Sequence, residues 1–275
     1  MSATKLLLSG IAVASALLVF GSQSVSAADL AARMPAKAPV YVAPPFSWTG
    51  FYIGAHAGYH WGSDRASTAT NPVGWTVAGA AAVDAITPGT VHPGGFMGGG
   101  QIGYNWQMNN FVVGIEADAS YMGGTASRAV TGFAVINPAD VFTTSAESRF
   151  LATLRPRLGL AVDRALFYVT GGLAVSNVKF TDSFGSFANT SVATISSDTT
   201  RAGWTAGVGM EYAFTGNWSV KAEYLYADFG NYTQTIPNCA LCGPGSEISV
   251  THKYTENIGR IGLNYKFGGP VVARY

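Results

Sequence analysis

Two pairs of charged residues form the strongest chemical pattern in this sequence of 275 residues. Glu116 and Asp118 are two positions apart, and so are Arg155 and Arg157. Because residues i and i+2 point to the same face of a β-strand, we expect these four side chains to form a cross-strand ion cluster. Such a cluster either stabilises a narrow interior or lines a thin path for solutes. The same counting gives two looser ion pairs: Glu211 with Lys221, and Glu223 with Arg260.

The four histidines are candidates for metal binding and for acid–base chemistry. His56 and His60 would share a strand face, but four residues of strand separate them by about 13 Å, which is too far for one metal ion. No local motif places a nucleophile such as Ser beside a His and an acid, as hydrolysis requires. We therefore expect no catalytic residue, no metal site and no cofactor.

Cys239 and Cys242 are the only cysteines, and they are three positions apart. In an oxidising compartment we expect them to form a small disulfide within one loop. A redox site of this spacing would need a helix N-terminus, and a zinc site would need two more ligands.

The composition limits the classes of protein to which this chain can belong. Of its residues 48% are hydrophobic and only 11% are charged, against roughly 25% charged residues in soluble domains. The 12% of aromatic residues exclude a disordered chain. A net charge of +1, with no long basic run, gives no basis for binding nucleic acid.

The first 27 residues have the pattern of a secretory signal peptide. Lys5 precedes a long apolar run, and the small residues that follow suit cleavage between Ala27 and Ala28. Residues 28–47 contain four prolines and few bulky side chains, which predicts an extended periplasmic linker. Peptidoglycan contact is the alternative to a plain spacer. No later segment has 18 uninterrupted apolar residues, as a membrane-spanning helix would.

Between residues 48 and 267, apolar side chains alternate with small or polar ones, which is the pattern of β-strands. The clearest segment is 111–121, where Phe, Val, Ile, Ala and Tyr alternate with Gly, Glu, Asp and Ser. Pro156 weakens the prediction of the fourth strand because proline has no N–H to donate. We predict eight strands: about 51–61, 96–107, 111–121, 149–163, 165–180, 201–214, 218–229 and a last strand ending with 260–267.

The connections between these strands alternate in length. Several long loops argue against a compact soluble domain, whereas outer-membrane barrels have short periplasmic turns and long outer loops. A secreted β-sandwich would carry a charged outer face, but the polar face here is rich in Gly, Thr, Ser and Asn, which suits a narrow interior. We therefore expect an all-β fold, an eight-stranded antiparallel transmembrane β-barrel over residues 48–267. The predicted short turns are 107–110, 163–164 and 215–217, and the predicted long extracellular loops are 62–94, 122–148, 181–200 and 230–252.

Four sequence blocks carry a resemblance to a known family. They are Phe46–Gly54 (FSWTGFYIG), Gln101–Trp106 (QIGYNW), Ala222–Tyr226 (AEYLY) and Gly259–Phe267 (GRIGLNYKF). In this order, behind a signal peptide and an Ala/Pro linker, they resemble the porin-like outer-membrane proteins of alphaproteobacteria and, more distantly, opacity adhesins. The resemblance covers about residues 1–267. It implies an immunogenic surface barrel that contributes to envelope integrity and, in host-associated species, to host contact.

Residues 268–275 depart from that family, whose members commonly end at a terminal Phe that the barrel assembly machinery recognises. Either Phe267, used internally, or the last residue, Tyr275, would then be the assembly signal. The resemblance also implies contact with outer-membrane lipid and lipopolysaccharide. We expect a structural and surface-interaction role without catalysis. A narrow diffusion channel for small solutes is the second hypothesis, and an outer-membrane lipid-modifying enzyme is the third.

Overall fold

The computed structural model describes residues 46–71, 73, 77–85, 89–131, 141–185, 192–237 and 245–268. Several sequence predictions concern residues outside these ranges. They are the signal peptide with its cleavage between Ala27 and Ala28, the linker up to residue 45, the disulfide between Cys239 and Cys242, and Tyr275.

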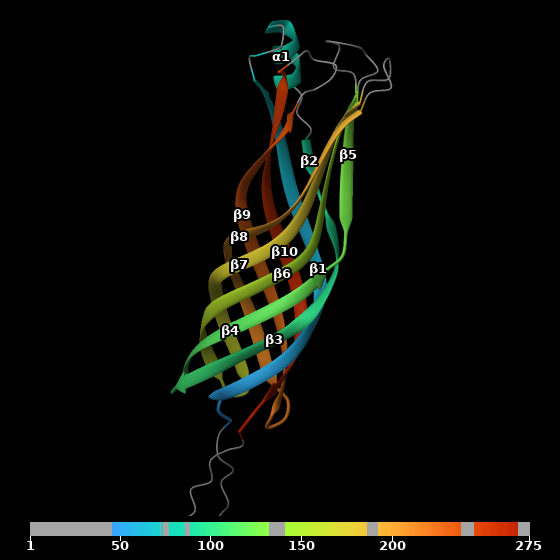
Figure 1. Cartoon of the computed structure of the whole chain (residues 1–275). Helices are drawn as coiled ribbons and strands as arrows, with labels where there is room; N and C mark the ends of the chain where they lie inside the picture. The colour runs from blue at the N-terminus through green and yellow to red at the C-terminus, as the bar shows by residue number, and fades with distance from the viewer. Residues whose placement is uncertain are drawn as a thin grey trace, which may run out of the picture. The chain divides into compact units, whose positions relative to one another are not determined.

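The described chain consists almost entirely of β-strands (Figure 1). Its one helix, α1, is eight residues long, and no helix in the described ranges combines the length and apolar character needed to cross a membrane. The elements are β1 (Gly50–Thr70), α1 (Val77–Asp84), β2 (Gly89–Val91), β3 (Gly94–Met108), β4 (Phe111–Met122), β5 (Thr125–Thr131), β6 (Val141–Val162), β7 (Ala165–Gly185), β8 (Val192–Ala213), β9 (Trp218–Pro237) and β10 (Glu247–Lys266).

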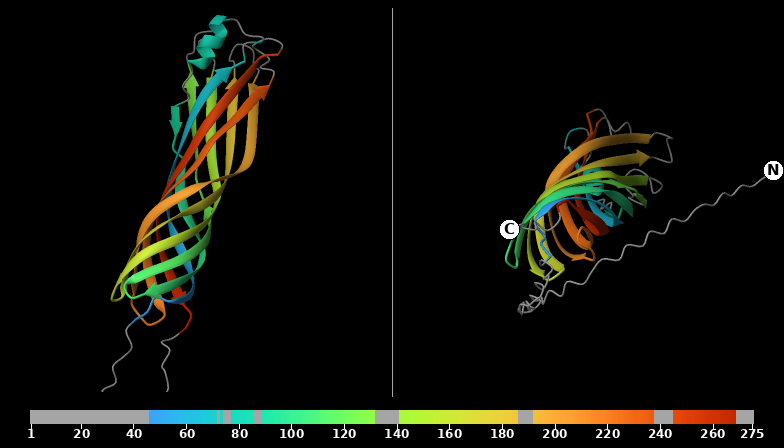
Figure 2. Two further views of the ribbon diagram at one scale, coloured as in Figure 1. Left: turned by 90° about the vertical axis from the view of Figure 1, so that its left-hand side faces the viewer. Right: turned by 90° about the horizontal axis from the view of Figure 1, so that it is seen from below.

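Eight of the described strands close into a barrel. They pair antiparallel in the order β1, β3, β4, β6, β7, β8, β9 and β10, and the ladder between β10 and β1 completes the ring (Figures 1 and 2). β2 adds to β1, and β5 adds to β6. A path from each residue to its partner on the next strand, started at Ser63 of β1, goes once around the barrel and comes back to β1 at Ile53, ten residues closer to the lower end. The strands are therefore strongly tilted relative to the barrel axis. The predicted eight-stranded antiparallel barrel is confirmed.

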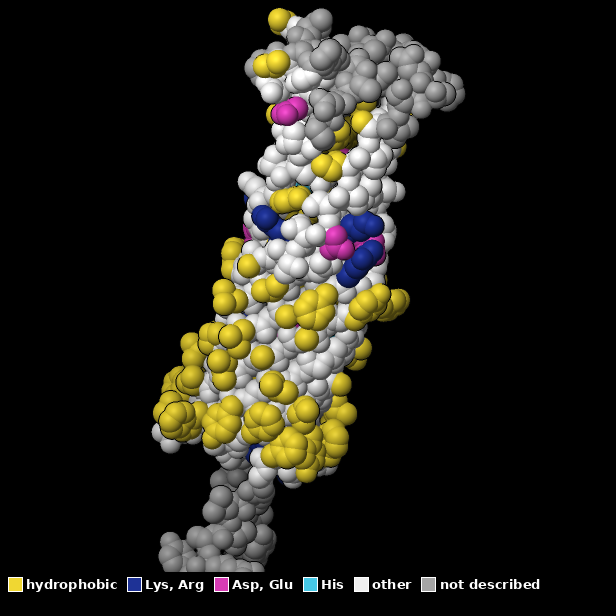
Figure 3. Space-filling model, viewed as in Figure 1, with side chains coloured by type: hydrophobic (Ala, Val, Ile, Leu, Met, Phe, Trp, Pro, Cys, Tyr) yellow, Lys and Arg dark blue, Asp and Glu magenta, His cyan; other side chains and the backbone are white. Residues whose placement is uncertain are grey.

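The alternation of side chains places an apolar belt on the outside of the lower barrel (Figure 3). Aromatic side chains mark both edges of this belt, as in barrels that cross a membrane. The upper girdle comprises Trp61, Phe96, Tyr121, Phe150 and Trp204. The lower girdle comprises Phe51, Trp106, Phe111, Phe214 and Phe267.

The three predicted short turns lie at the lower end of the barrel, where β1 begins and β10 ends (Figure 2). Asn109 and Asp163 hold positive φ angles of 55° and 52° in two of them, a conformation that Asn and Asp tolerate better than other side chains. Thr215–Asn217 joins β8 to β9 in the third. The positions of these turns are as the sequence predicted.

Pro156 lies inside β6 without ending the strand. The β6–β7 ladder has a gap at this point, because its pairs pass from Leu154 with Leu173 to Arg157 with Thr170. The absent N–H of proline falls in that gap. Pro156 itself faces outward in the apolar belt.

The predicted extent of the four long loops is wrong. β1 continues to Thr70, β7 to Gly185 and β9 to Pro237, while β6, β8 and β10 start early, at Val141, Val192 and Glu247. Helix α1 and strands β2 and β5 also lie within predicted loops. Above the upper girdle the outward-facing side chains are polar, so the alternation of apolar and polar residues that predicts strands is lost there. The strands still form, because Thr and Val favour extended backbone.

Above the upper girdle the wall divides into two sheets. β9, β10, β1 and β2 form one, and β5, β6, β7 and β8 form the other (Figure 1). The β8–β9 ladder stops at Trp204 and Asp228, and no ladder joins β2 to β5 within the described ranges. An apolar cluster holds the two sheets face to face. Its members include Ala66, Phe142, Phe184, Ile236 and Val250.

Candidate functional site

Eight charged side chains point into the barrel at the level of the apolar belt. Each is buried, and four acids face four bases, so the layer is formally neutral. Burying a charge is costly unless an opposite charge and hydrogen bonds compensate it, so the contacts of this layer decide what it can do. The charged layer comprises Glu116 and Asp118 on β4, Arg155 and Arg157 on β6, Glu211 on β8, Lys221 and Glu223 on β9, and Arg260 on β10.

Arg155 and Arg260 lie at the centre of the charged layer. Nη2 of Arg155 donates to Oε1 of Glu116 at 2.8 Å and to Oδ2 of Asp118 at 2.9 Å. Arg260 reaches Oδ1 of Asp118 at 2.8 Å and Oε2 of Glu223 at 2.6 Å. Arg260 and Glu223 are also direct partners in the β9–β10 ladder. Nη1 of Arg155 also lies 3.2 Å from Oε1 of Glu223 on β9, so each arginine joins carboxylates from both sides of the lumen.

Arg157 and Lys221 extend the layer to the remaining acids. Nη1 of Arg157 lies 3.3 Å from Oε2 of Glu211 and 3.6 Å from Oε2 of Glu116. Nζ of Lys221 donates to both oxygens of Glu116, at 2.8 and 3.0 Å. The structure therefore brings all four residues of the expected cross-strand cluster into one network.

The looser pairing of Glu211 with Lys221 is wrong. These residues are neighbours in the β8–β9 ladder, yet the ion pairs found in the described structure join Lys221 to Glu116 on the opposite wall. Ser219 and Asn264 donate hydrogen bonds to Glu211. The long stem of Lys221 can cross the narrow lumen, so strand register alone does not select its partner.

Neutral side chains complete the hydrogen bonding of the charged layer. Tyr52 donates to Glu116 at 2.7 Å, and Tyr168 donates to Glu223 at 3.0 Å. The guanidinium of Arg157 also lies between these two aromatic rings, 4.8 Å from the centre of Tyr52 and 5.1 Å from that of Tyr168. Sequence reasoning missed both tyrosines, although Tyr52 shares the inward face of Gly54 and His56.

Apolar side chains close the barrel below and above the charged layer. Trp48 occupies the lower mouth with only 2% of its surface exposed, and its backbone N–H donates to Oε1 of Gln107 at 2.7 Å. Phe46 packs edge-on against Trp48, and Lys266 lies over the ring of Phe46. The apolar layer above includes Met97, Met122, Leu151, Val178, Phe180 and Leu225.

A second polar cluster lies above the upper girdle, outside the apolar belt. Nδ1 of His252 lies 2.8 Å from Oδ2 of Asp64, and its Nε2 lies 3.0 Å from Oδ2 of Asp182. Burial lowers the pKa of His252, but its hydrogen bonds to Asp182 and Asp64 and the charges of these carboxylates outweigh that effect and raise the pKa to about 9. Because His252 is on β10 and Asp182 is on β7, this contact ties the two upper sheets together.

The other histidines have separate surroundings. His56 contacts Gln101 at 3.0 Å and Ser120 at 2.7 Å. His60 contacts Glu256 at 3.1 Å, and His92 is exposed. Across the described ranges, no group of three or more His, Cys, Asp or Glu side chains has the geometry to hold a metal ion.

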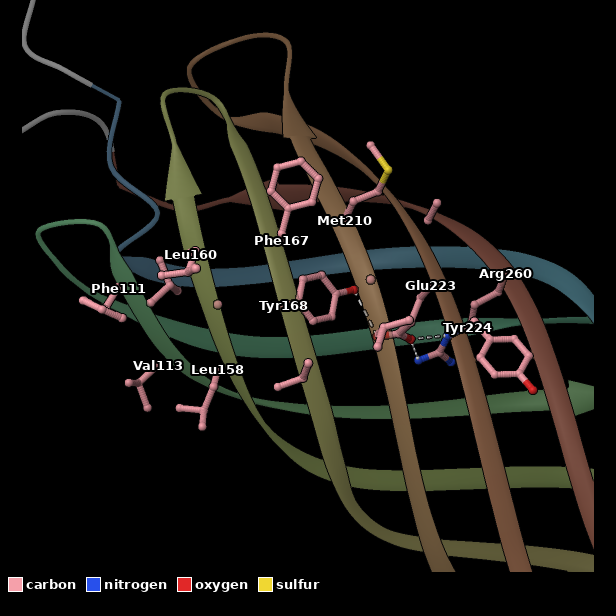
Figure 4. A pocket seen from close by; sticks show the side chains of 16 residues that line it. Phe111, Val113, Leu158, Leu160, Phe167, Tyr168, Met210, Glu223, Tyr224 and Arg260 are labelled. Carbon is pink, nitrogen blue, oxygen red and sulfur yellow. Dashed lines mark hydrogen bonds and ion pairs between the residues drawn. The ribbon is translucent and has the colours of Figure 1, made fainter.

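A hollow of about 1000 Å³ indents the outer wall of the lower barrel (Figure 4). Phe111, Leu160 and Met210 are among the apolar side chains that line it, and all three are exposed in the apolar belt. Glu223 and Arg260 lie behind it and are paired with each other. The hollow therefore presents an apolar surface, of the kind that acyl chains contact, rather than a polar binding site.

Comparison with known proteins gives consistent matches along most of the chain. A model of the family described as outer membrane protein beta-barrel domain matches residues 14–267. The chain is similar to the 31 kDa outer-membrane immunogenic protein of Brucella melitensis, with 36% identity over 250 residues that cover 89% of this chain and 94% of the relative. The 25 kDa outer-membrane immunogenic protein of the same organism is 29% identical, covering 93% and 96% of the two chains. The 22 kDa outer membrane protein of Rhizobium leguminosarum bv. viciae is 28% identical, covering 82% and 81%.

Proposed function

We propose that this chain, which belongs to the outer membrane protein beta-barrel domain family, is a closed barrel with a structural and surface-contact role. It is an integral surface protein of the outer membrane of an alphaproteobacterium. The burial of the charged layer is the observation that carries this proposal. Arg155 is 0% exposed and Glu116 is 2% exposed. In a water-filled pore these side chains would be wet.

The energetics of the charged layer also favour a closed barrel. Every member has an opposite charge within reach, and removing one partner from a buried ion pair leaves an uncompensated charge that costs several kcal/mol. A solute path through this layer would require separating the pairs that Arg155 and Arg260 make across the lumen. Trp48 would also have to leave the lower mouth.

The relatives support the surface-contact half of the proposal. The two Brucella relatives are named immunogenic proteins, which is not a kind of enzyme. The two upper sheets of this chain rise beyond the apolar belt, so they would be the part exposed outside the cell. We propose contact with lipopolysaccharide and with a host or environmental surface there, and a peptidoglycan contact for the linker.

Among the described residues, Ser120 and His56 resemble a nucleophile–base pair, and their surroundings argue against catalysis. Oγ of Ser120 lies 2.7 Å from Nε2 of His56. Both side chains are buried inside the barrel, and the second ring nitrogen of His56 contacts the amide of Gln101 rather than a carboxylate. We propose that this pair stabilises the interior.

Electrical conductance of the refolded protein in a planar bilayer tests the closed barrel. Folding is verified beforehand by the difference in gel migration between unboiled and boiled samples. We expect a silent bilayer with the wild-type protein and with Arg149→Gln, whose side chain lies above the upper girdle. Reproducible small steps that change in Arg155→Gln and not in Arg149→Gln would overturn the proposal in favour of a narrow channel.

A further inference from the structure

Two basic side chains lie next to each other on the outer face of the barrel, just above the upper girdle. Arg65 of β1 and Lys253 of β10 are direct partners in the antiparallel β1–β10 ladder, and both are exposed. We call these two residues the basic pair. Like charges directly opposite each other on neighbouring strands repel and destabilise a sheet. The basic pair therefore costs stability in the protein alone, and an anion bound over it would remove that cost.

The described surroundings of the basic pair provide no compensating carboxylate. Among the described residues, no ion pair includes Arg65 or Lys253. Asp228, an acid on the outer face of β9, instead accepts a hydrogen bond from a backbone N–H at 2.8 Å. The next ladder partners on either side are uncharged, Thr90 beside Arg65 and Asn231 beside Lys253.

A third cation reaches the same row of residues from β8. Nη2 of Arg201 donates to the carbonyl oxygen of Asn231 at 2.7 Å, and Asn231 is the ladder partner of Lys253. The guanidinium of Arg201 also lies 5.0 Å from the centre of the Tyr232 ring. Both partners of this half-buried arginine are uncharged. An excess of positive charge therefore extends along one row of the wall, from β1 to β8.

Cations at a similar level on β6 and β7 are flanked by acids instead. Nε of Arg149 lies 2.8 Å from Oε1 of Glu147, and its Nη1 lies 3.5 Å from Oδ2 of Asp198. Lys179 is the ladder partner of Glu147 on one side and of Asp198 on the other. Two bases thus meet two acids, and this part of the wall is formally neutral. The excess of positive charge belongs to one side of the barrel rather than to this level as a whole.

The membrane determines what lies over the basic pair. Trp61 of the upper girdle is on the same outer face of β1 as Arg65 and four residues below it, which is at most about 13 Å along the strand. Aromatic girdles mark the interfaces of the membrane, and the headgroups add roughly 5–8 Å to the hydrocarbon core on each side. Long basic side chains direct their charged ends towards this polar layer. The basic pair is therefore within reach of the headgroups of the outer leaflet.

We propose that the basic pair binds a phosphate group of lipopolysaccharide in the outer leaflet. Arginine and lysine both bind phosphate through charge-assisted hydrogen bonds. The bound phosphate would remove the repulsion between Arg65 and Lys253, and the exposed amide of Asn231 can donate to a further oxygen. The inference rests on the proposed contact with lipopolysaccharide, for which it names the residues and the chemical group. It is independent of whether the lumen is closed.

Retention of lipopolysaccharide by the immobilised full-length protein in detergent micelles tests the site. EDTA is present, so that no divalent cation bridges an acid to a phosphate. We expect the double variant Arg65→Gln with Lys253→Gln to retain at least roughly fivefold less lipopolysaccharide than the wild type. Arg149→Gln with Lys179→Gln removes the same charge from the neutral part of the wall and should retain as much as the wild type. All variants must show the migration shift of a folded barrel.

The possible failures of this experiment are distinguishable. Equal retention by the two double variants overturns the site but leaves the proposed contact with lipopolysaccharide in place. Absence of retention by the wild type overturns both. Neither result changes the conductance test of the closed barrel.

Phosphatase-treated lipopolysaccharide tests the chemical group. We expect the wild type to retain this glycolipid no better than Arg65→Gln with Lys253→Gln retains the untreated one. The exchange Arg65→Lys with Lys253→Arg keeps both charges and should retain the untreated glycolipid. Inorganic polyphosphate at the same phosphate concentration should displace little of it. Unchanged retention after phosphatase treatment, or full displacement by polyphosphate, overturns the assignment to a lipid phosphate.

The unfolding midpoint separates binding from a structural role of the pair. Without lipopolysaccharide, Lys253→Gln should be at least as stable as the wild type, because it removes the repulsion with Arg65. Added lipopolysaccharide should raise the midpoint of the wild type more than that of the variant, because a ligand that binds only the folded state stabilises it. A variant that is less stable without the glycolipid, or an equal gain in both proteins, contradicts the proposal.

Discussion

Nη2 of Arg155 lies 2.8 Å from Oε1 of Glu116, and the same two residues are direct partners in the β4–β6 ladder. Strand register and charge pairing therefore coincide here, as they do for Arg260 and Glu223 in the β9–β10 ladder. The same Nη2 also reaches Asp118, two residues further along β4. Nη1 of Arg155 lies 3.2 Å from Oε1 of Glu223, so the loss of Arg155 should leave three buried carboxylates less well compensated.

Arg155→Ala should lower the free energy of unfolding by about 3–5 kcal/mol, because it leaves buried carboxylates without compensation. Urea unfolding of the protein in lipid vesicles measures this change. Arg149→Ala is the matched control, since Arg149 pairs with Glu147 and Asp198 at the surface, with 42% of its side chain exposed. We expect no measurable change there. Equal destabilisation by the two substitutions would contradict a compensated interior layer.

The double variant Arg155→Met with Glu116→Gln should be less destabilised than the sum of the two single variants. Removing both charges removes the penalty that each single substitution creates by leaving the other charge buried. The same urea titration, run as a double-mutant cycle, measures the coupling. Additive effects would mean that Arg155 and Glu116 do not stabilise each other.

Stability should fall with rising pH through the titration of His252. Its pKa in the folded protein is about 9, against about 6.5 for an ordinary histidine, because Asp182 and Asp64 outweigh the effect of burial. The contribution is therefore complete below pH 6.5 and lost between pH 6.5 and 9, and the shift corresponds to roughly 3 kcal/mol. The unfolding midpoint of the wild type should decline over this window, and that of His252→Gln should decline less. Parallel profiles for the two proteins would refute the assignment.

Val208→Arg should cost about 2–4 kcal/mol of stability in a bilayer, because this outward-facing side chain lies in the middle of the apolar belt. Ser196→Arg, on the outer face of the same strand but above the upper girdle, should cost almost nothing. Unfolding from vesicles of fixed composition compares them. A similar cost at both positions would place the membrane boundary elsewhere.

Phe267→Ala should reduce the amount of protein assembled in the outer membrane if Phe267 is the internal assembly signal. Its N–H donates to the carbonyl of Phe51, and its ring lies 5.1 Å from that of Tyr265. Phe214→Ala is the control, because Phe214 belongs to the same lower girdle and is similarly exposed. Immunoblots of outer-membrane fractions measure both. Unchanged levels of Phe267→Ala would leave Tyr275 as the candidate signal.

The sequence by itself predicted the features that depend on neighbouring residues. The alternation in 111–121 identifies a strand with one face in lipid and one face inside, and the spacing of Glu116 and Asp118 places both carboxylates inside. The three short turns follow from the breaks in that alternation. These signals are strong inside the apolar belt because a lipid-facing side chain must be apolar and an inward-facing one must fit a narrow lumen.

Only the tertiary structure decided which distant groups meet. Lys221 passes over its strand neighbour Glu211 and pairs with Glu116 across the lumen, because a flexible side chain is not bound by strand register. Asp64, Asp182 and His252 come together from three strands, and all three lie in segments that the sequence predicted as loops. Above the membrane, water replaces lipid, and the alternation of apolar and polar residues weakens. The length of the strands and the point where the β8–β9 ladder ends therefore depend on pairing between residues far apart in the sequence, which neighbouring residues alone do not predict.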